Sequence, residues 1–346
     1  MGKTIVLKDD RFLNHVTSYG HPECPERLEA IYAMLQQPDV SAVFTEVQPR
    51  PATQDEIALN HDRAYINSIE QTAGADFTSL DPDTSTSAGS WEAAVLAAGA
   101  VLTGIDMIVD GEASNGFALV RPPGHHAESS RAMGFCLFNN VAIGAHYLIK
   151  RHGMKRVLIF DWDIHHGNGT QNAFYAMPEV LYVSTHQYPY YPGSGAFEET
   201  GAGDGKGYTV NVPLPGGQGD ADYLHLCETL LRPIAREYRP EFIIVSAGYD
   251  IYDRDPLGTM NVTPDGFAAM TSCIKDLTSE VCNGRLLFSL EGGYNVQGIA
   301  ESVKQTLYAL GGDHGSVQTN GDTSAGVGKI VDRVRQVHAP VWKCFS

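Results

Sequence analysis

The sequence predicts a single α/β domain in which helices cover both faces of a parallel sheet. Several short runs are continuously apolar and rich in β-branched residues, as strands buried on both faces are. Longer helical patterns separate these runs, and such alternation is typical of a parallel sheet. The 346 residues, 43% of them hydrophobic, also supply enough apolar surface for one large core.

The expected elements follow one another up to residue 310 without an internal repeat or a linker. Strands are expected at residues 4–7, 117–120, 156–160, 180–184, 242–247 and 286–290. Helices are expected at residues 91–110, 139–150, 221–238, 264–282 and 297–310, with Thr263 as the N-cap of the fourth. Residues 311–346 form a tail, with a flexible stretch at 311–328, rich in Gly, Ser, Thr and Asp, and a short amphipathic helix at 330–338.

Composition restricts the partners and the compartment. With 24 Lys and Arg against 41 Asp and Glu, the net charge is −17, so no basic excess exists to bind nucleic acid. No apolar run is expected to approach the ~18 residues of a membrane span, and residues 4–7 are too short for a signal-peptide core. The six cysteines form no C-x-x-C pair, which predicts reduced thiols in a cytoplasmic protein. Whether the chain forms a homo-oligomer stays open.

Polar residues follow four of the expected strands at the point where each strand ends. They are R-P-P-G-H-H at 121–126, D-W-D-I-H-H at 161–166, G-Y-D at 248–250 and E-G-G-Y at 291–294. In open parallel sheets, ligands bind outside the carboxyl ends of the strands. We therefore expect these four segments to meet at one edge of the sheet.

Asp163 and His165 are expected to point to the same side of an extended chain and to bind a metal. A carboxylate oxygen and an imidazole nitrogen suit zinc or iron(II). A catalytic zinc site has three protein ligands and an open position, and Asp250 is the best third ligand. The alternative is that Asp163 and His165 are only a pair in a surface loop.

His125 and His126 follow a stiff Pro-Pro-Gly turn. As further metal ligands they would leave the metal no vacancy, so acid–base chemistry is the better expectation. Asp161 and Asn168 are the available partners, and they would act differently. An Asp would hold an imidazolium, whereas an Asn would leave the basicity closer to normal. A purely structural role for both histidines is the alternative.

Aromatic residues are expected around this site. Tyr294 lies on a glycine-rich turn, where its hydroxyl could hydrogen-bond a developing oxyanion. Phe135 and the pair Tyr190 and Tyr191 could form a slot for an alkyl chain, although aromatic residues are more often core or rim packing.

The motifs that hold these residues resemble those of the zinc-dependent histone deacetylase family. They are R-P-P-G-H-H-A-E, G-F-C-L-F-N-N, D-W-D-I-H-H-G-N-G-T-Q, S-A-G-Y-D, D-P-L-G and E-G-G-Y. The sequence around Asn168 is similar to that of the class II branch and its bacterial relatives, including acetylpolyamine amidohydrolases. The resemblance implies the arginase/deacetylase fold with an eight-stranded parallel sheet. It makes residues 1–310 the catalytic domain and 311–346 a tail.

The resemblance also implies a role for each site residue. Zinc would be held by Asp163, His165 and Asp250. His126 would be the general base and acid, and His125, held by Asp161, its electrostatic partner. Tyr294 would stabilise the transition state. Substrate would meet Phe135, Tyr191, the Gly134 carbonyl and a rim aspartate, Asp83. Structural potassium would lie at Asp161, Asp163, His165, Ser184 and Thr185, with a second site at Phe174, Val180 and Tyr208.

Three departures from the family pattern bear on the reaction. Tyr249 stands where the family usually has Phe, and Tyr252 argues against the two-metal arginase branch. Leu257 stands where the polyamine-specific branch has Glu, which favours acetyl-lysine or a permissive enzyme. We therefore expect an amidohydrolase that deacetylates acetyl-lysine peptides or small acylated amines. The alternatives are an acetylpolyamine deacetylase and, in another class, a pseudoenzyme that binds acyl groups without turnover.

Overall fold

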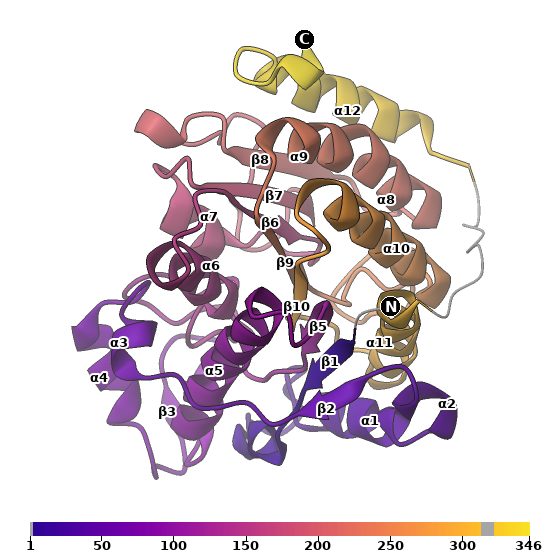
Figure 1. Cartoon of the computed structure of the whole chain (residues 1–346). Helices are drawn as coiled ribbons and strands as arrows, with labels where there is room; N and C mark the ends of the chain where they lie inside the picture. Colours follow the sequence, from indigo (N-terminus) through magenta and orange to yellow (C-terminus); the bar gives the residue numbers. More distant parts are fainter. Residues whose placement is uncertain (1–2, 313–321) are drawn as a thin grey trace.

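Eight parallel strands form the central sheet of the computed structural model, which describes residues 3–312 and 322–346 (Figure 1). Their order is β2-β1-β5-β10-β9-β6-β7-β8. The strands are β1 (Thr4–Leu7), β2 (Thr45–Val47), β5 (Asn115–Ala118), β6 (Val157–Asp161), β7 (Val180–Gln187), β8 (Thr209–Leu214), β9 (Phe242–Ala247) and β10 (Leu286–Leu290). Two short strands, β3 (Thr78–Ser79) and β4 (Ser85–Thr86), form a separate antiparallel pair.

The parallel eight-stranded sheet confirms the predicted fold class, but the sequence did not predict every strand. β1, β9 and β10 have the expected bounds, and β7 runs three residues further. β5 begins two residues earlier than expected and ends at Ala118. β2 was not expected because it has only three residues, none of them buried. β8 was not expected because Asn211 and Pro213 interrupt its apolar pattern.

Helices cover both faces of the sheet (Figure 1). α5 and α6 lie together on one face, and α10 packs between α8, α9 and α11 on the other. The helices are α1 (Glu26–Leu35), α2 (Pro38–Ser41), α3 (Gln54–Ile57), α4 (Arg63–Glu70), α5 (Ser90–Val109), α6 (Asn140–Arg151), α7 (Asn168–Phe174), α8 (Asp220–Leu226), α9 (Arg232–Tyr238), α10 (Pro264–Val281), α11 (Val296–Gly311) and α12 (Ala325–His338). A π-helical turn (Cys227–Leu231) joins α8 to α9 within the helix expected at 221–238.

Local capping explains where several helices begin. The Thr263 side chain accepts a hydrogen bond from the Gly266 N–H, so Thr263 is the N-cap predicted for α10. Asn139 and Asn295 cap α6 and α11 in the same way. Each of these helices therefore starts at a fixed residue beside the carboxyl-end loops of the sheet.

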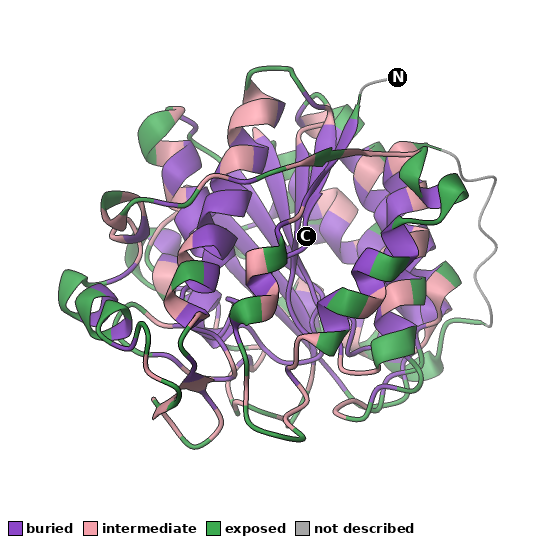
Figure 2. Ribbon diagram, turned by 90° about the horizontal axis from the view of Figure 1, so that it is seen from below, coloured by how far each residue is buried: buried purple, intermediate pink, exposed green. Residues whose placement is uncertain are grey.

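The helix α5 corrects one expectation. Among the described residues it is the one helix long and apolar enough to cross a membrane, whereas no such run was expected. Of its most apolar 18-residue window, 72% is buried inside the domain. It packs against α6, β5 and β10, so its apolar surface belongs to the core that Figure 2 shows between the layers.

The tail returns to the domain. α12 packs against β8, with Val327, Val331 and Val334 buried. The Trp342 indole N–H donates to the Gly207 carbonyl at 2.8 Å. Residues 313–321 of the stretch predicted to be flexible lie outside the described residues.

Candidate active site

Four neighbouring strands bring the predicted site residues to one edge of the sheet. β5, β10, β9 and β6 lie side by side in that order, and all are parallel. The loops after their carboxyl ends hold the two histidines, the E-G-G-Y turn, Asp250 and the D-W-D-I-H-H segment. Side chains as far apart in the sequence as His125 and Tyr294 therefore meet at one place.

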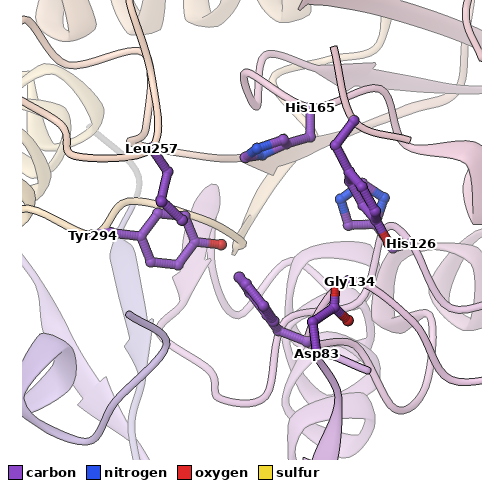
Figure 3. A pocket seen from close by; sticks show the side chains of 8 residues that line it. Asp83, His126, Gly134, His165, Leu257 and Tyr294 are labelled. Carbon is purple, nitrogen blue, oxygen red and sulfur yellow. The ribbon is translucent and has the colours of Figure 1, made fainter. Parts of the chain in front are cut away.

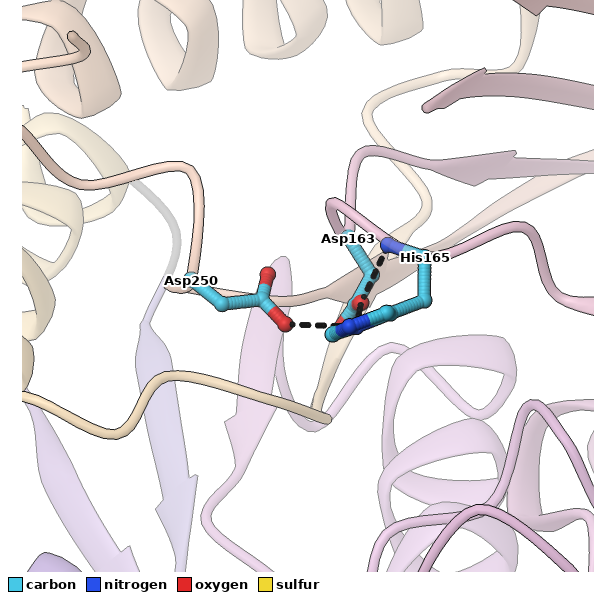
Figure 4. Close-up of side chains that lie close together, drawn as sticks. All are labelled: Asp163, His165 and Asp250. Atoms are coloured by element: carbon cyan, nitrogen blue, oxygen red, sulfur yellow. Dashed lines mark hydrogen bonds and ion pairs between the residues drawn. The ribbon is translucent and has the colours of Figure 1, made fainter. Parts of the chain in front are cut away.

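Asp163, His165 and Asp250 form a buried group that could hold a metal ion (Figure 4). One ligand atom from each lies within 4.8 Å of the others. The Nδ1 of His165 is 3.1 Å from Asp163 Oδ1 and 3.1 Å from Asp250 Oδ2. Donors at about 2.0–2.2 Å from a tetrahedral ion lie roughly 3.3–3.6 Å apart, so the three residues fit a small divalent cation.

The backbone at Gly292 lies close against the carboxylates of Asp163 and Asp250. The Gly292 N–H donates to Asp163 Oδ2 at 2.9 Å. A Cβ at Gly292 would lie only 2.3 Å from Asp250 Oδ2, so this close approach requires glycine. The E-G-G-Y turn thus holds one predicted ligand and leaves room for another.

The charges of this group also favour a cation. Burial, reinforced by the charge of Asp163, raises the pKa of Asp250 to about 7. Burial also raises the pKa of Asp161. Within the described ranges, the ion pairs of these three carboxylates are all with histidines. We call Asp161, Asp163 and Asp250 the aspartate cluster.

The two adjacent histidines have different partners, as the sequence predicted. His125 Nδ1 lies 3.1 Å from Asp161 Oδ2, and His126 Nδ1 lies 2.8 Å from Asn168 Oδ1. Burial opposes a charge on His125, but Asp163 and Asp161 raise its pKa to about 10. Burial and the charge of His125 hold the pKa of His126 well below its usual value. These shifts favour an imidazolium at His125 and a neutral imidazole at His126.

Asn168 fixes which nitrogen of His126 is free. The Asn168 Nδ2 donates to Glu128 Oε1 at 2.9 Å, so its Oδ1 is the atom that faces His126. The neutral His126 must then donate from Nδ1, which leaves Nε2 without a proton. This tautomer gives His126 a basic nitrogen that is not used by Asn168.

The residues predicted to meet substrate line one narrow pocket of about 80 Å³ (Figure 3). The pocket is lined by Asp83, His126, Gly134, Phe135, His165, Tyr191, Leu257 and Tyr294. Gly134 has a φ of +56°, and a Cβ there would lie 2.3 Å from the His126 ring. Glycine is thus required for the chain to pass this close to His126.

Aromatic rings surround the pocket. Tyr191 meets His126 edge to face at 5.1 Å between centroids, and Phe135 meets Tyr294 in the same manner at 5.8 Å. Burial raises the pKa of the Tyr294 hydroxyl well above its usual value. The phenol is therefore protonated at neutral pH and can donate a hydrogen bond into the pocket.

Two residues that sequence reasoning did not assign, Glu291 and Asp255, contribute to the site, and Tyr190, expected in the aromatic slot, lies against a predicted metal ligand. Glu291 accepts the N–H groups of Gly124 and His125, at 2.6 and 3.1 Å. Asp255 accepts the N–H of Tyr294, and the Tyr190 ring stacks on His165. Glu291 and Asp255 each stand inside a quoted motif, E-G-G-Y and D-P-L-G, which was the available signal.

The residues named for the first potassium site lie in the aspartate cluster or on the neighbouring strand β7. Ser184 stands opposite Asp161 in the pairing of β6 with β7. The Thr185 hydroxyl is buried without a hydrogen-bond partner among the described residues. Near the second predicted site, the Tyr208 carbonyl accepts the Tyr182 N–H at 2.9 Å. Both potassium sites stay predictions.

A second buried charged group lies beneath the E-G-G-Y turn. Glu23 pairs with Arg27 at 3.0 Å and with Arg121 through both of its oxygens. Arg27 also donates to the carbonyls of Gly293 and Glu291, each at 2.6 Å. All three side chains are fully buried. We call Glu23, Arg27 and Arg121 the arginine cluster.

Comparison with known proteins agrees with this architecture. A family model described as the histone deacetylase domain matches residues 21–310. Histone deacetylase 10, chloroplastic, of Oryza sativa subsp. japonica is 39% identical over 311 residues, which cover 85% of this chain and 70% of that protein. A probable deacetylase of Archaeoglobus fulgidus is 35% identical over 359 residues, with 99% of each chain covered.

A solved structure agrees as well. The crystal structure of the HDA15 HD domain matches with a TM-score of 0.92 at 39% identity, and the match covers 99% of this chain and 96% of that one. The fold, the ordered motifs and these relatives lead to the same conclusion: this chain belongs to the histone deacetylase family.

Proposed function

We propose that this protein is a metal-dependent amidohydrolase that removes the acetyl group from acetyl-lysine side chains. The observation that carries the proposal is the buried donor group Asp163, His165 and Asp250 beside a pocket that also contains His126. These residues would hold zinc or iron(II), since two carboxylates and an imidazole suit either ion. When bound, the ion would polarise the acetyl carbonyl and lower the pKa of water.

The two histidines would divide the proton transfers. His126 would accept a proton from the attacking water at its free Nε2 and later deliver it to the leaving amine. His125, an imidazolium paired with Asp161, would stabilise negative charge beside it. The Tyr294 hydroxyl would donate to the oxygen on which charge develops in the transition state.

The pocket walls would select a linear alkyl chain. Phe135 and Tyr191 would enclose the methylene groups, and Leu257 would complete the wall. The Gly134 carbonyl would accept the amide N–H of the substrate. At the rim, Asp83 would accept a backbone N–H of a peptide.

An acetylpolyamine is the second candidate substrate, and Asp83 is the observation that favours it. Its carboxylate lies at the pocket and could meet the distal ammonium group. The test compares kcat/KM for an acetyl-lysine peptide and for acetylputrescine. We expect preference for the peptide, and Leu257→Glu should shift the preference toward acetylputrescine. Preference of the unaltered enzyme for acetylputrescine would contradict the peptide assignment.

We also propose a cytoplasmic location and structural potassium. All six cysteines are free, which is typical of a reducing compartment. Potassium would lie beside Asp161 and Ser184, where the buried Thr185 hydroxyl still has a hydrogen bond to make.

A further inference from the structure

One chain of hydrogen bonds joins three segments that meet at the pocket. The Tyr190 hydroxyl donates to the Leu257 carbonyl at 2.9 Å. The Leu257 N–H donates to Asp255 Oδ1 at 2.9 Å. The other oxygen of Asp255 accepts the N–H groups of Tyr294 and Asn295, at 2.6 and 3.1 Å. We call Tyr190, Leu257, Asp255 and Tyr294 the bracket.

Both ends of the bracket are fixed at the site. The Tyr190 ring stacks on His165, with 5.5 Å between centroids and 21° between planes. Asp255 is only 7% exposed, so water competes little for its hydrogen bonds. Leu257 and Tyr294 themselves line the pocket, on the side away from His126 in Figure 3.

The two loops that the bracket joins are held by side-chain hydrogen bonds, including one from Asn295 Nδ2 to the Arg254 carbonyl at 2.8 Å. Leu257 and Tyr294 lie outside every helix and strand. Their backbone positions therefore depend on side-chain hydrogen bonds more than on secondary structure. A carboxylate that accepts from both loops sets the distance between them, and with it the width of the pocket.

The geometry points to Tyr190 and Asp255 as positioning residues that set the width of the pocket and so its preference for a small acyl group on a linear chain. This inference rests on the proposed function for the identity of the substrate. The Tyr190 hydroxyl bonds Leu257 alone, whereas the Asp255 carboxylate accepts from both Leu257 and Tyr294. The two residues should therefore affect KM and kcat differently.

The first experiment removes only the hydroxyl oxygen of Tyr190. Tyr190→Phe keeps the ring on His165 but loses the bond to Leu257. We expect KM for an acetyl-lysine peptide to rise about 2- to 10-fold, the range for one neutral hydrogen bond, with kcat little changed. The preference for acetyl-lysine over butyryl-lysine should fall by a similar factor. Tyr238→Phe is the matched control, since its hydroxyl also donates to a backbone carbonyl, that of Pro178, outside the pocket lining.

The second experiment removes the shared acceptor. Asp255→Asn keeps the shape of the side chain but replaces one carboxylate oxygen by an NH₂ group. That group cannot accept the backbone N–H of Leu257, or those of Tyr294 and Asn295, that now donate to the oxygen it replaces. Because Tyr294 loses its backbone anchor as well, kcat should fall and KM should rise. In the double variant the effects on KM should not add, since both changes release Leu257. Should Asp255→Asn fail to fold, Tyr190→Phe alone decides the test.

Amide hydrogen exchange separates this inference from the proposed function. Asp255→Asn should speed exchange of the Leu257, Tyr294 and Asn295 amides, and Tyr190→Phe that of Leu257 only, without any substrate present. If the unaltered enzyme hydrolyses no acyl-lysine, the proposed function fails while this measurement still tests the bracket. The bracket is overturned if Tyr190→Phe matches Tyr238→Phe in KM, acyl preference and Leu257 exchange.

Discussion

Two fully buried groups of charged side chains lie close together in this molecule, and they differ in what satisfies their charges. In the arginine cluster, Glu23 bonds to both guanidinium groups, and their remaining bonds go to backbone carbonyls. In the aspartate cluster, three carboxylates have histidines as their ion-pair partners among the described residues. The first group is neutralised by arginines of the protein itself, whereas the second has only histidines as ion-pair partners among the described residues and could hold a metal ion.

The ionisation of the two groups reflects this difference. Although burial opposes it, Arg121 lowers the pKa of Glu23 to about 2. Burial, reinforced by the charge of Asp163, instead raises the pKa of Asp250 to about 7, although His165 lowers it. Repulsion between two buried carboxylates costs free energy that a bound cation would offset. Buried charge thus belongs to a structural element in one place and to a candidate metal site in the other.

The largest expected effect comes from the aspartate cluster. Asp163→Asn and Asp250→Asn each keep the side-chain shape but remove a metal ligand. Turnover should fall by more than the ~10–100-fold that loss of an outer-shell partner costs. Added zinc should raise the melting temperature of the unaltered protein, since a ligand at 100 times its Kd adds about 2.7 kcal/mol of stability. Neither variant should show that rise. A normal rise in both variants would contradict the metal assignment.

The histidine pair sharpens the comparison within the site. His126→Ala should lose about 10²–10⁴-fold in kcat, as removal of a general base does, while its zinc content stays normal. His125→Ala should lose less, because it acts only through charge. Metal analysis and steady-state kinetics on both variants check this. If His125→Ala is inactive and His126→Ala is nearly normal, the two roles are exchanged.

The arginine cluster should respond in stability rather than in metal binding. Glu23→Gln leaves two buried guanidinium groups without their counterion, which should cost about 3–5 kcal/mol of unfolding free energy. Urea denaturation measures it. The control is Asp55→Asn, which breaks an exposed pair with Arg63 and should cost less than about 1 kcal/mol. Equal losses of unfolding free energy in the two variants would show that burial of the arginine cluster does not determine the cost of breaking it.

Tyr294→Phe tests a group that lies between the two clusters. The Arg27 guanidinium carbon lies 5.0 Å from its ring centroid, and the ring itself lines the pocket. Losing one oxyanion donor should lower kcat about 10²–10³-fold, or roughly 3–4 kcal/mol. Stability and zinc content should be unchanged because the ring is kept. A variant that retains more than a tenth of kcat/KM on the true substrate would exclude Tyr294 as the donor.

The smallest expected effect is a pH dependence from Glu23. Its pKa is about 4.5 when unfolded and about 2 when folded, so its contribution is complete above pH 4.5 and is lost as the pH falls toward 2. That contribution is roughly 3 kcal/mol. The stability difference between the unaltered protein and Glu23→Gln should therefore shrink between pH 5 and pH 3. A constant difference would contradict the lowered pKa.

The sequence predicted the central strands and the residues that follow them, because long apolar runs and ordered motifs are local signals. It missed β2 and β8, whose short or interrupted patterns become strands only beside a paired neighbour. The arginine cluster was missed for a related reason. Glu23 and Arg121 are 98 residues apart, and no local pattern shows that they meet. Asp255 was likewise assigned no role, since its bonds go to backbone N–H groups.

The helix α12 has a consequence for how this chain can be shortened. Among residues 3–312 and 322–346, β8 is the last strand of the sheet and pairs only with β7, and α12 packs against it. A chain cut after Leu310, where the family match ends, would lose α12 and the indole that binds the Gly207 carbonyl. Exposed strand edges pair with other chains and aggregate. The practical limit for a well-behaved shortened protein is therefore set by an edge strand rather than by the boundary of the family.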